Sequence, residues 1–149
     1  MGDGETRLVA AATARKWLED PRVGYDGGVG SQALSCVAIA GARVSVAERG
    51  RVVCSLRVRA PVADAEGRWH AGAIAAAVDC VCSAVAYTVE AAPTATVHYS
   101  LSYFSPADRD ARARTRSLGP AGIRIRRGYE RCRGIVWILH WGTHRIVGR

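Results

Sequence analysis

Residues 69–87, with the sequence WHAGAIAAAVDCVCSAVAY, form a long apolar run that decides the fold. Alanine favours helix, and no proline lies between Trp69 and Pro93, so we expect one continuous helix here. A helix that is apolar on every side has to be covered by protein or by lipid. Near its middle lies a single carboxylate, Asp79. An acid in such surroundings has either a strong structural partner or a chemical task.

Lipid is the disfavoured cover for this helix. Alanine gains little on transfer into a membrane, and a carboxylate near the middle of a spanning helix costs about 2.5–3.5 kcal/mol. The chain has 149 residues, of which 49% are hydrophobic and 23% charged, and this is the composition of one globular domain with a core. We therefore expect no transmembrane segment.

The segments around the helix predict an α+β fold. Residues 5–19 have the period of an amphipathic helix, whose apolar side is formed by Leu8, Val9, Ala12, Trp17 and Leu18. Strand-like patterns occupy residues 35–47, 51–60, 94–104, 111–118, 123–127 and 135–141. An antiparallel sheet is the natural cover for one long central helix.

The loop after the first helix contains Gly28-Val29-Gly30-Ser31-Gln32-Ala33, the outline of a dinucleotide-binding turn. Such a turn follows a strand and opens a helix. Here no strand is expected before the loop and the residues after it read as a strand, so we reject a nucleotide site. We divide the chain into an N-terminal helix and loop, residues 1–34, and a main domain, residues 35–149.

The net charge of +8 comes from the C-terminal part of the chain. Residues 1–106 hold ten basic and ten acidic residues, whereas residues 107–149 hold eleven arginines and three acids. Such a segment suits a nucleic acid, an acidic membrane surface, a phosphorylated small molecule or plain solvent. Nucleic acid is the disfavoured partner, because Tyr129 is the only aromatic residue within 109–133 that could stack on a base.

The five cysteines, at positions 36, 54, 80, 82 and 132, are an odd number without paired spacing. Cys80 and Cys82 point to different sides of a helix, so we expect core thiols and no metal site. Without a signal peptide, reduced thiols indicate an intracellular protein. The cytoplasm is the simplest location, with mitochondrion, peroxisome and plastid left open.

The start of the central helix resembles that of the hotdog-fold acyl-CoA thioesterases, in particular the group called acyl-CoA thioesterase 13 or thioesterase superfamily member 2. In that family His-Gly-Gly-Ala-Ile-Ala precedes an Asp by a little over two turns, and here the residues are His70-Ala71-Gly72-Ala73-Ile74-Ala75 and Val78-Asp79. The family strand that ends Tyr-x-Ser-Pro matches Thr96-Val97 and Tyr103-Phe104-Ser105-Pro106. The similarity spans about residues 35–106 and weakens in the basic part, 106–149.

The resemblance implies a hotdog fold, in which an antiparallel sheet wraps one long central helix. It also implies homodimers or homotetramers with active sites between subunits. The implied reaction is the hydrolysis of acyl-CoA to a fatty acid and coenzyme A, a step of fatty acid metabolism that needs no cofactor.

The resemblance assigns roles residue by residue. Asp79 matches the catalytic carboxylate, which acts as general base or as nucleophile. Thr96 matches the hydroxyl that orients the attacking water. His70, Ala71 and Gly72 match the helix start that positions and polarises the thioester carbonyl, where unpaired amides and the helix dipole favour negative charge.

Substrate contacts are expected at two further places. Asp64 falls where animal relatives carry an Asn. The arginines Arg124, Arg126 and Arg127 could bind the phosphates of coenzyme A.

Three simpler interpretations stay open. Asp79 could be a structural acid paired across a dimer, and His70 could only cap the helix. The whole protein could be a catalytically inactive hotdog module that binds acyl-CoA or a protein partner.

Overall fold

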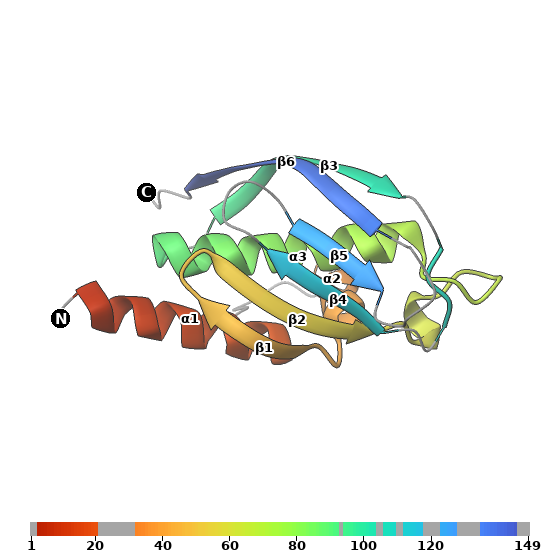
Figure 1. Ribbon diagram of the computed structural model, residues 1–149, viewed down its shortest axis with the longest axis horizontal. Coiled ribbons are helices and arrows are strands. Elements are labelled where there is room, and N and C mark those ends of the chain that lie inside the picture. The colour runs from red at the N-terminus through yellow and green to blue at the C-terminus, as the bar shows by residue number, and fades with distance from the viewer. Residues whose placement is uncertain are drawn as a thin grey trace.

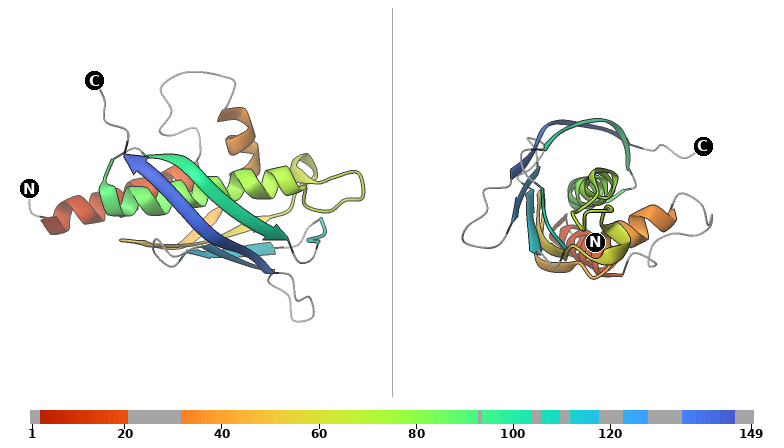
Figure 2. Two further views of the ribbon diagram at one scale, coloured as in Figure 1. Left: turned by 90° about the horizontal axis from the view of Figure 1, so that it is seen from above. Right: turned by 90° about the vertical axis from the view of Figure 1, so that its right-hand side faces the viewer.

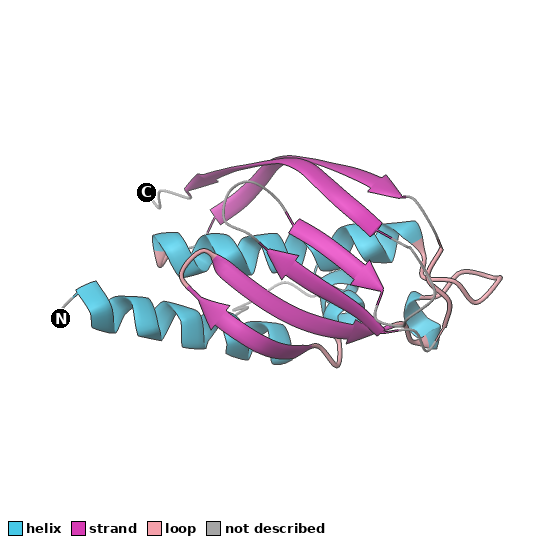
Figure 3. Cartoon of the chain, in the orientation of Figure 1, coloured by secondary structure: helices cyan, strands magenta, loops and turns pink. Residues whose placement is uncertain are grey.

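A computed structural model of the chain describes residues 3–20, 32–92, 94–103, 106–109, 112–117, 123–127 and 135–145. The elements in this part of the chain are α1 (Asp3–Glu19), α2 (Gln32–Ile39), β1 (Arg43–Glu48), β2 (Arg51–Arg57), the short 3-10 helix η1 (Ala60–Val62), α3 (Ala71–Glu90), β3 (Thr94–Tyr103), β4 (Arg112–Ser117), β5 (Ile123–Arg127) and β6 (Ile135–Arg145). Figure 1 labels the helices and strands, and Figure 3 separates helices from strands by colour.

The strands form one antiparallel sheet in the order β1-β2-β4-β5-β6-β3. The sheet curves around α3, as the view along the helix in Figure 2 shows. α1 and α2 lie on the side of α3 that the sheet leaves free. The predicted α+β architecture, with a sheet wrapped around one long helix, is confirmed.

The central helix α3 runs from Ala71 to Glu90, close to the expected range. It ends where Ala91 adopts a left-handed φ of 50° and donates its N–H to the carbonyl of Tyr87 at 2.9 Å. Most of its side chains are buried, but Ala75, Ala76, Asp79 and Ser83 are only half-buried. The face of α3 that carries the carboxylate is therefore less covered than the rest of the helix.

By length and composition alone, α3 could also cross a membrane. Its most apolar window is 61% buried inside the structure, against the sheet and the other two helices. This burial is typical of the core helix of a folded domain, in agreement with the sequence-based expectation.

Helix α1 extends over the predicted residues but turns a different face inward. Its buried side chains are Ala10, Ala11, Ala14 and Leu18, whereas Leu8 is 75% exposed and Val9 54% exposed. The reason is the neighbour: α1 packs along the alanine-rich α3, and small side chains allow two helices to approach closely. The predicted apolar side was therefore wrong for Leu8, Val9 and the exposed Ala12.

Two charged residues attach α1 to the edge strand β1. The guanidinium of Arg15 donates to the carbonyl of Val44 at 2.5 Å, and the amide of Val44 donates to the carboxylate of Glu19 at 2.9 Å. Both outward backbone groups of Val44 are thus satisfied by one i,i+4 pair. This contact closes part of an edge that could otherwise pair with another strand.

The segment 35–47 was expected to be one strand, but its first part is helical. α2 ends at Ile39, Gly41 turns the chain with a φ of 79°, and only then does β1 begin. A short apolar run fits a buried helix and a buried strand equally well, and here packing on α3 selects the helix. A helix thus follows the rejected nucleotide turn, but α1 rather than a strand precedes it, and residues 21–31 lie outside the described part.

The C-terminal strands complete the sheet. β4, β5 and β6 agree with the expected segments, and β6 pairs with β3 so that Thr96 lies opposite Thr143. β3 is an edge strand whose neighbour in the sheet is β6. The position of Thr96 therefore depends on the C-terminal strand.

Candidate active site

Asp79 and Thr96 lie against each other across the half-buried face of α3. The hydroxyl of Thr96, on β3, donates a hydrogen bond to Oδ1 of Asp79 at 2.6 Å. The two residues are 17 positions apart in the sequence, and the sheet brings them together. Because the threonine uses its proton on the carboxylate, its oxygen can still accept a hydrogen bond from water. The pair can therefore hold a water molecule beside a base.

His70 caps the beginning of α3. It is the N-cap residue, with extended φ and ψ of −62° and 134°, and its Nδ1 accepts the N–H of Gly72 at 3.0 Å. This bond requires an unprotonated Nδ1, so the neutral ring carries its proton on Nε2. A β-carbon on Gly72 would lie 3.2 Å from two atoms of this ring, so glycine gives the imidazole the room it needs.

The hydrogen bonds of this cap do not include the N–H of Ala71. Ala73 and Ile74 donate to the carbonyl of His70, both at 3.0 Å, and Gly72 donates to the ring. Within the described residues, the N–H of Ala71 has no acceptor, and Ala71 is exposed. An accessible amide at the positive end of a helix suits a developing oxyanion.

Tyr103 is a residue of this region to which the sequence reasoning assigned no role. It is the last residue of β3, and its hydroxyl donates to the carbonyl of Ala71 at 3.1 Å. Its place in the Tyr-x-Ser-Pro segment was the available signal. A sequence motif does not show which group a side chain contacts. The next two residues of this segment, Phe104 and Ser105, lie outside the described residues.

The arrangement of helix and sheet matches solved structures over most of their length. The PaaI protein of E. coli, from the phenylacetic acid degradation operon, aligns with a TM-score of 0.65 over 93% of this chain and 97% of its own, at 14% identity. Zebrafish thioesterase superfamily member 2 aligns with a TM-score of 0.65 over 89% and 98%, at 17% identity. The chain has the hotdog fold.

A third hotdog structure is a hypothetical thioesterase from Streptococcus pneumoniae with coenzyme A. It aligns with a TM-score of 0.55 over 70% of this chain and 88% of its own, at 15% identity. No model of a protein family and no curated protein matches the sequence. The predicted hotdog fold is therefore confirmed through structure, and the neighbours of this chain include thioesterases.

In this hotdog fold, Asp64 lies in the turn before α3 and bonds to that turn. Its Oδ1 accepts the amides of Glu66 at 3.1 Å and Arg68 at 2.8 Å, and its Oδ2 accepts from the Arg68 guanidinium at 3.1 Å. The backbone N–H of Arg68 is the main reason that the pKa of this carboxyl is lowered. These contacts order the turn before α3, and the predicted substrate contact of Asp64 stays a prediction from the sequence.

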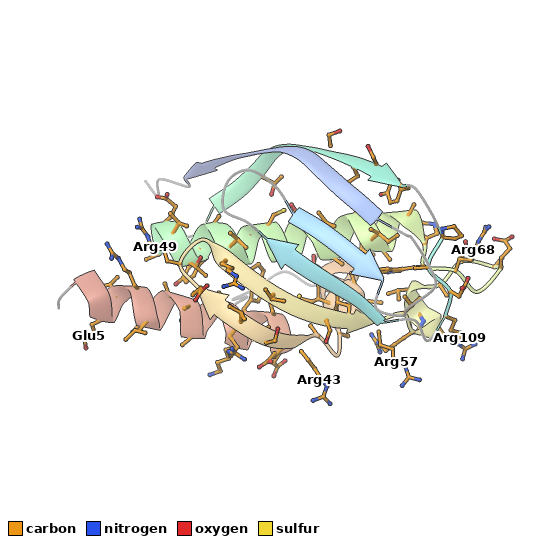
Figure 4. All side chains as sticks on the ribbon, viewed as in Figure 1. Glu5, Arg43, Arg49, Arg57, Arg68 and Arg109 are labelled. Carbon is orange, nitrogen blue, oxygen red and sulfur yellow. The ribbon has the colours of Figure 1, made fainter. Side chains whose placement is uncertain are left out.

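The three arginines predicted to bind phosphates lie in β5. Arg124 lies opposite Arg116 in the sheet and Arg126 opposite Arg114, while the side chains of Arg124, Arg126 and Arg127 lie outside the described part of the structure. Other arginines are described near the start of α3. Figure 4 shows Arg57, Arg68 and Arg109 at this end of the molecule and Arg49 at the opposite end.

The thiols of Cys80 and Cys82, which lie beside Asp79 in α3, are poor candidates for a catalytic nucleophile. Cys80 and Cys82 are buried, and burial raises the pKa of the Cys80 thiol to about 11 and raises the pKa of Cys82 as well. Both are protonated at neutral pH and are poor nucleophiles. Among the side chains that the structure describes, no group of three His, Cys, Asp or Glu residues could hold a metal ion. Cys132 lies outside the described residues.

Proposed function

We propose that this hotdog protein hydrolyses an acyl-CoA thioester to a fatty acid and coenzyme A. The hydrogen bond between Thr96 and Asp79 carries the proposal, because it places a carboxylate and a hydroxyl together on a half-buried helix face. Thioesterases among the neighbours, one of them with coenzyme A, support the same class of substrate.

The residues divide the reaction between them. A water held by Thr96 gives a proton to Asp79 as its oxygen attacks the thioester carbonyl carbon. The carbonyl oxygen gains negative charge, which the N–H of Ala71 stabilises. The C–S bond then breaks, and the coenzyme A thiolate takes up the proton. Direct attack by Asp79, followed by hydrolysis of the resulting anhydride, uses the same groups.

The spacing along α3 supports a site that is shared between two copies of the chain. Ala71 and Asp79 are eight residues apart, which is about 12 Å along a helix axis at 1.5 Å per residue. An aspartate side chain is too short to cover that distance, so one carbonyl group cannot contact both residues of one chain. We therefore propose a homo-oligomer in which Asp79 of one subunit acts with Ala71 of another.

Phosphates of coenzyme A need cations near the place where the thioester enters. The backbone N–H of Arg109 donates to the carbonyl of Gly67 at 2.7 Å, which places this exposed arginine beside the turn before α3. Arg109 is therefore a candidate for binding these phosphates, and so is Arg57, which lies at the same end of the molecule (Figure 4). Arg124, Arg126 and Arg127 remain a prediction from the sequence.

The decisive experiment is the Asp79→Asn variant, measured by release of free thiol from a panel of acyl-CoA substrates. Asparagine can still accept the hydrogen bond of Thr96, so we expect an unchanged melting temperature. Because general-base catalysis contributes about 100-fold or more, kcat should fall by at least that factor.

The matched control is Glu90→Gln, which removes an exposed carboxylate from the other end of the same helix and should leave kcat unchanged. A substrate-free blank accounts for the half-buried Cys36 thiol of the protein itself. Full activity of Asp79→Asn would contradict the proposed role of the carboxylate. Saturable acyl-CoA binding without any thiol release by the wild type would favour the inactive binding module instead.

A further inference from the structure

Tyr103 and His70 hold the same peptide unit in the first turn of α3. The hydroxyl of Tyr103 donates to the carbonyl of Ala71 at 3.1 Å. The N–H on the other side of that peptide bond belongs to Gly72 and donates to Nδ1 of His70 at 3.0 Å. Both polar atoms of the Ala71–Gly72 peptide therefore have side-chain partners, one from β3 and one from the helix cap.

These contacts fix the direction of the Ala71 N–H. The peptide unit that contains this N–H also contains the carbonyl of His70, which accepts the amides of Ala73 and Ile74 at 3.0 Å each. The following peptide unit is held by Tyr103, as described above. With the peptide planes on both sides of Ala71 held, its N–H keeps one orientation. A donor that is already oriented needs no reorganisation when negative charge develops on the substrate.

The Tyr103 side chain contributes little to the core. It is 46% exposed, and the packing of β3 against the core comes from Leu101, while the ladder with β6 and the bond between Thr96 and Asp79 also hold the strand. A phenol at this place is therefore better explained by its hydrogen bond than by packing. The strand that presents Thr96 to the carboxylate also presents Tyr103 to the start of the helix.

We propose that Tyr103 is a positioning residue, which acts through the first peptide unit of α3 and sets the direction of the oxyanion donor, Ala71 N–H. The inference rests on the proposed hydrolysis of a thioester and adds a residue to that site. Tyr103 itself touches neither the carbonyl carbon nor the attacking water.

The Tyr103→Phe variant removes only the hydroxyl. Because the oriented donor acts on the transition state, kcat should fall about tenfold while KM changes less than about twofold. The melting temperature should stay the same, and the amide hydrogen of Gly72, which bonds to Nδ1 of His70, should exchange about tenfold faster because its peptide unit is no longer held by the phenol. The matched control is Ser45→Ala, which removes another hydroxyl that donates to a backbone carbonyl at 3.1 Å, that of Val53 in the β1–β2 hairpin. It should leave kcat and the exchange rate of the Gly72 amide unchanged.

A second variant tests whether Tyr103 acts through the amide. Ala71→Pro removes the N–H, and its geometry is tolerated: proline is favoured at the first helical position, and His70 already has the extended conformation required before proline. In this background, Tyr103→Phe should cause no further loss of kcat, because the donor that it orients is gone.

Two results would overturn the inference. One is a Tyr103→Phe enzyme with unchanged kcat or unchanged amide exchange, and the other is a full tenfold loss on top of Ala71→Pro. These results are distinct from a failure of the proposed function, which would be a wild-type protein that releases no thiol from any acyl-CoA and would remove the catalytic role of Tyr103 with it.

Discussion

Asp64 shows at the scale of one residue how a local turn sets the charge of a carboxylate. Its oxygens accept two backbone amides and one guanidinium, and the amide of Arg68 is the main cause of its lowered pKa. A group whose pKa is lower in the folded state stabilises the fold above its unfolded pKa, here 3.8, and loses this contribution as pH falls through the folded value.

We expect a carboxyl-carbon NMR titration of Asp64 to give a midpoint below 3.8, the value of the unperturbed group. Arg68→Gln removes the guanidinium but keeps the backbone N–H, so the midpoint should rise only part of the way. A midpoint at or above 3.8 in the wild type would contradict the bonds of this turn.

Individual residues of the candidate site could be predicted only where a motif specifies them. The resemblance to thioesterase motifs made the helix start, Asp79 and Thr96 candidates, and the structure brings Thr96 and Asp79 together. The role of Tyr103 could not be predicted, since an exposed tyrosine at the end of a strand has no pattern that reveals its acceptor. The bonds of Asp64 were equally hidden, because they depend on the exact course of the turn between Asp64 and Arg68.

At the scale of elements, α1 depends on the contact of Arg15 and Glu19 with β1. Glu19→Ala would leave the amide of Val44, a buried residue, without its partner. We expect the free energy of unfolding to fall by about 1–2 kcal/mol, the cost of an unsatisfied amide in a partly buried place. Urea denaturation measures this difference.

The control for Glu19 is Glu5→Ala on the same helix. Glu5 is exposed near the start of α1, as Figure 4 shows, and its removal should change the free energy of unfolding by less than about 0.5 kcal/mol. Equal losses in the two variants would mean that Glu19 acts through the net charge of the helix and not through Val44.

Elements were predictable where length or alternation was unambiguous. The long α3 and the alternating β3 agree with the expected segments. The segment 35–47 was not predictable, because the run of apolar and small residues 35–42 suits both a strand and a helix until a neighbour is known. The buried face of α1 was missed for a related reason: its partner α3 favours alanine over leucine in the contact.

At the scale of the whole molecule, the sequence could not tell what covers the helix. An apolar run shows that cover is needed, but it does not distinguish the chain's own sheet from a second copy. In the structure, the sheet, α1 and α2 leave Asp79 and Ser83 half-buried on one side. Our proposal of a shared active site assigns that side to another subunit.

A mixing experiment tests the shared site. Asp79→Asn and Ala71→Pro should each be nearly inactive as pure homo-oligomers. If Asp79 of one subunit acts with Ala71 of the other, a mixed dimer keeps one intact site, so refolding an equal mixture should restore about a quarter of wild-type activity. If both residues acted within one chain, no activity would return. Sedimentation velocity on the same samples shows whether mixed oligomers formed.

The pairing of β3 with β6 has a consequence for biosynthesis. β6 follows every other described strand in the order of translation, yet it is the sheet neighbour of the strand that carries Thr96 and Tyr103. A nascent chain therefore cannot complete the β3–β6 ladder, which positions Thr96 and Tyr103, until β6 has been made. Under the proposed function, products of premature termination before residue 135 would lack the strand that pairs with β3 and would not hydrolyse thioesters.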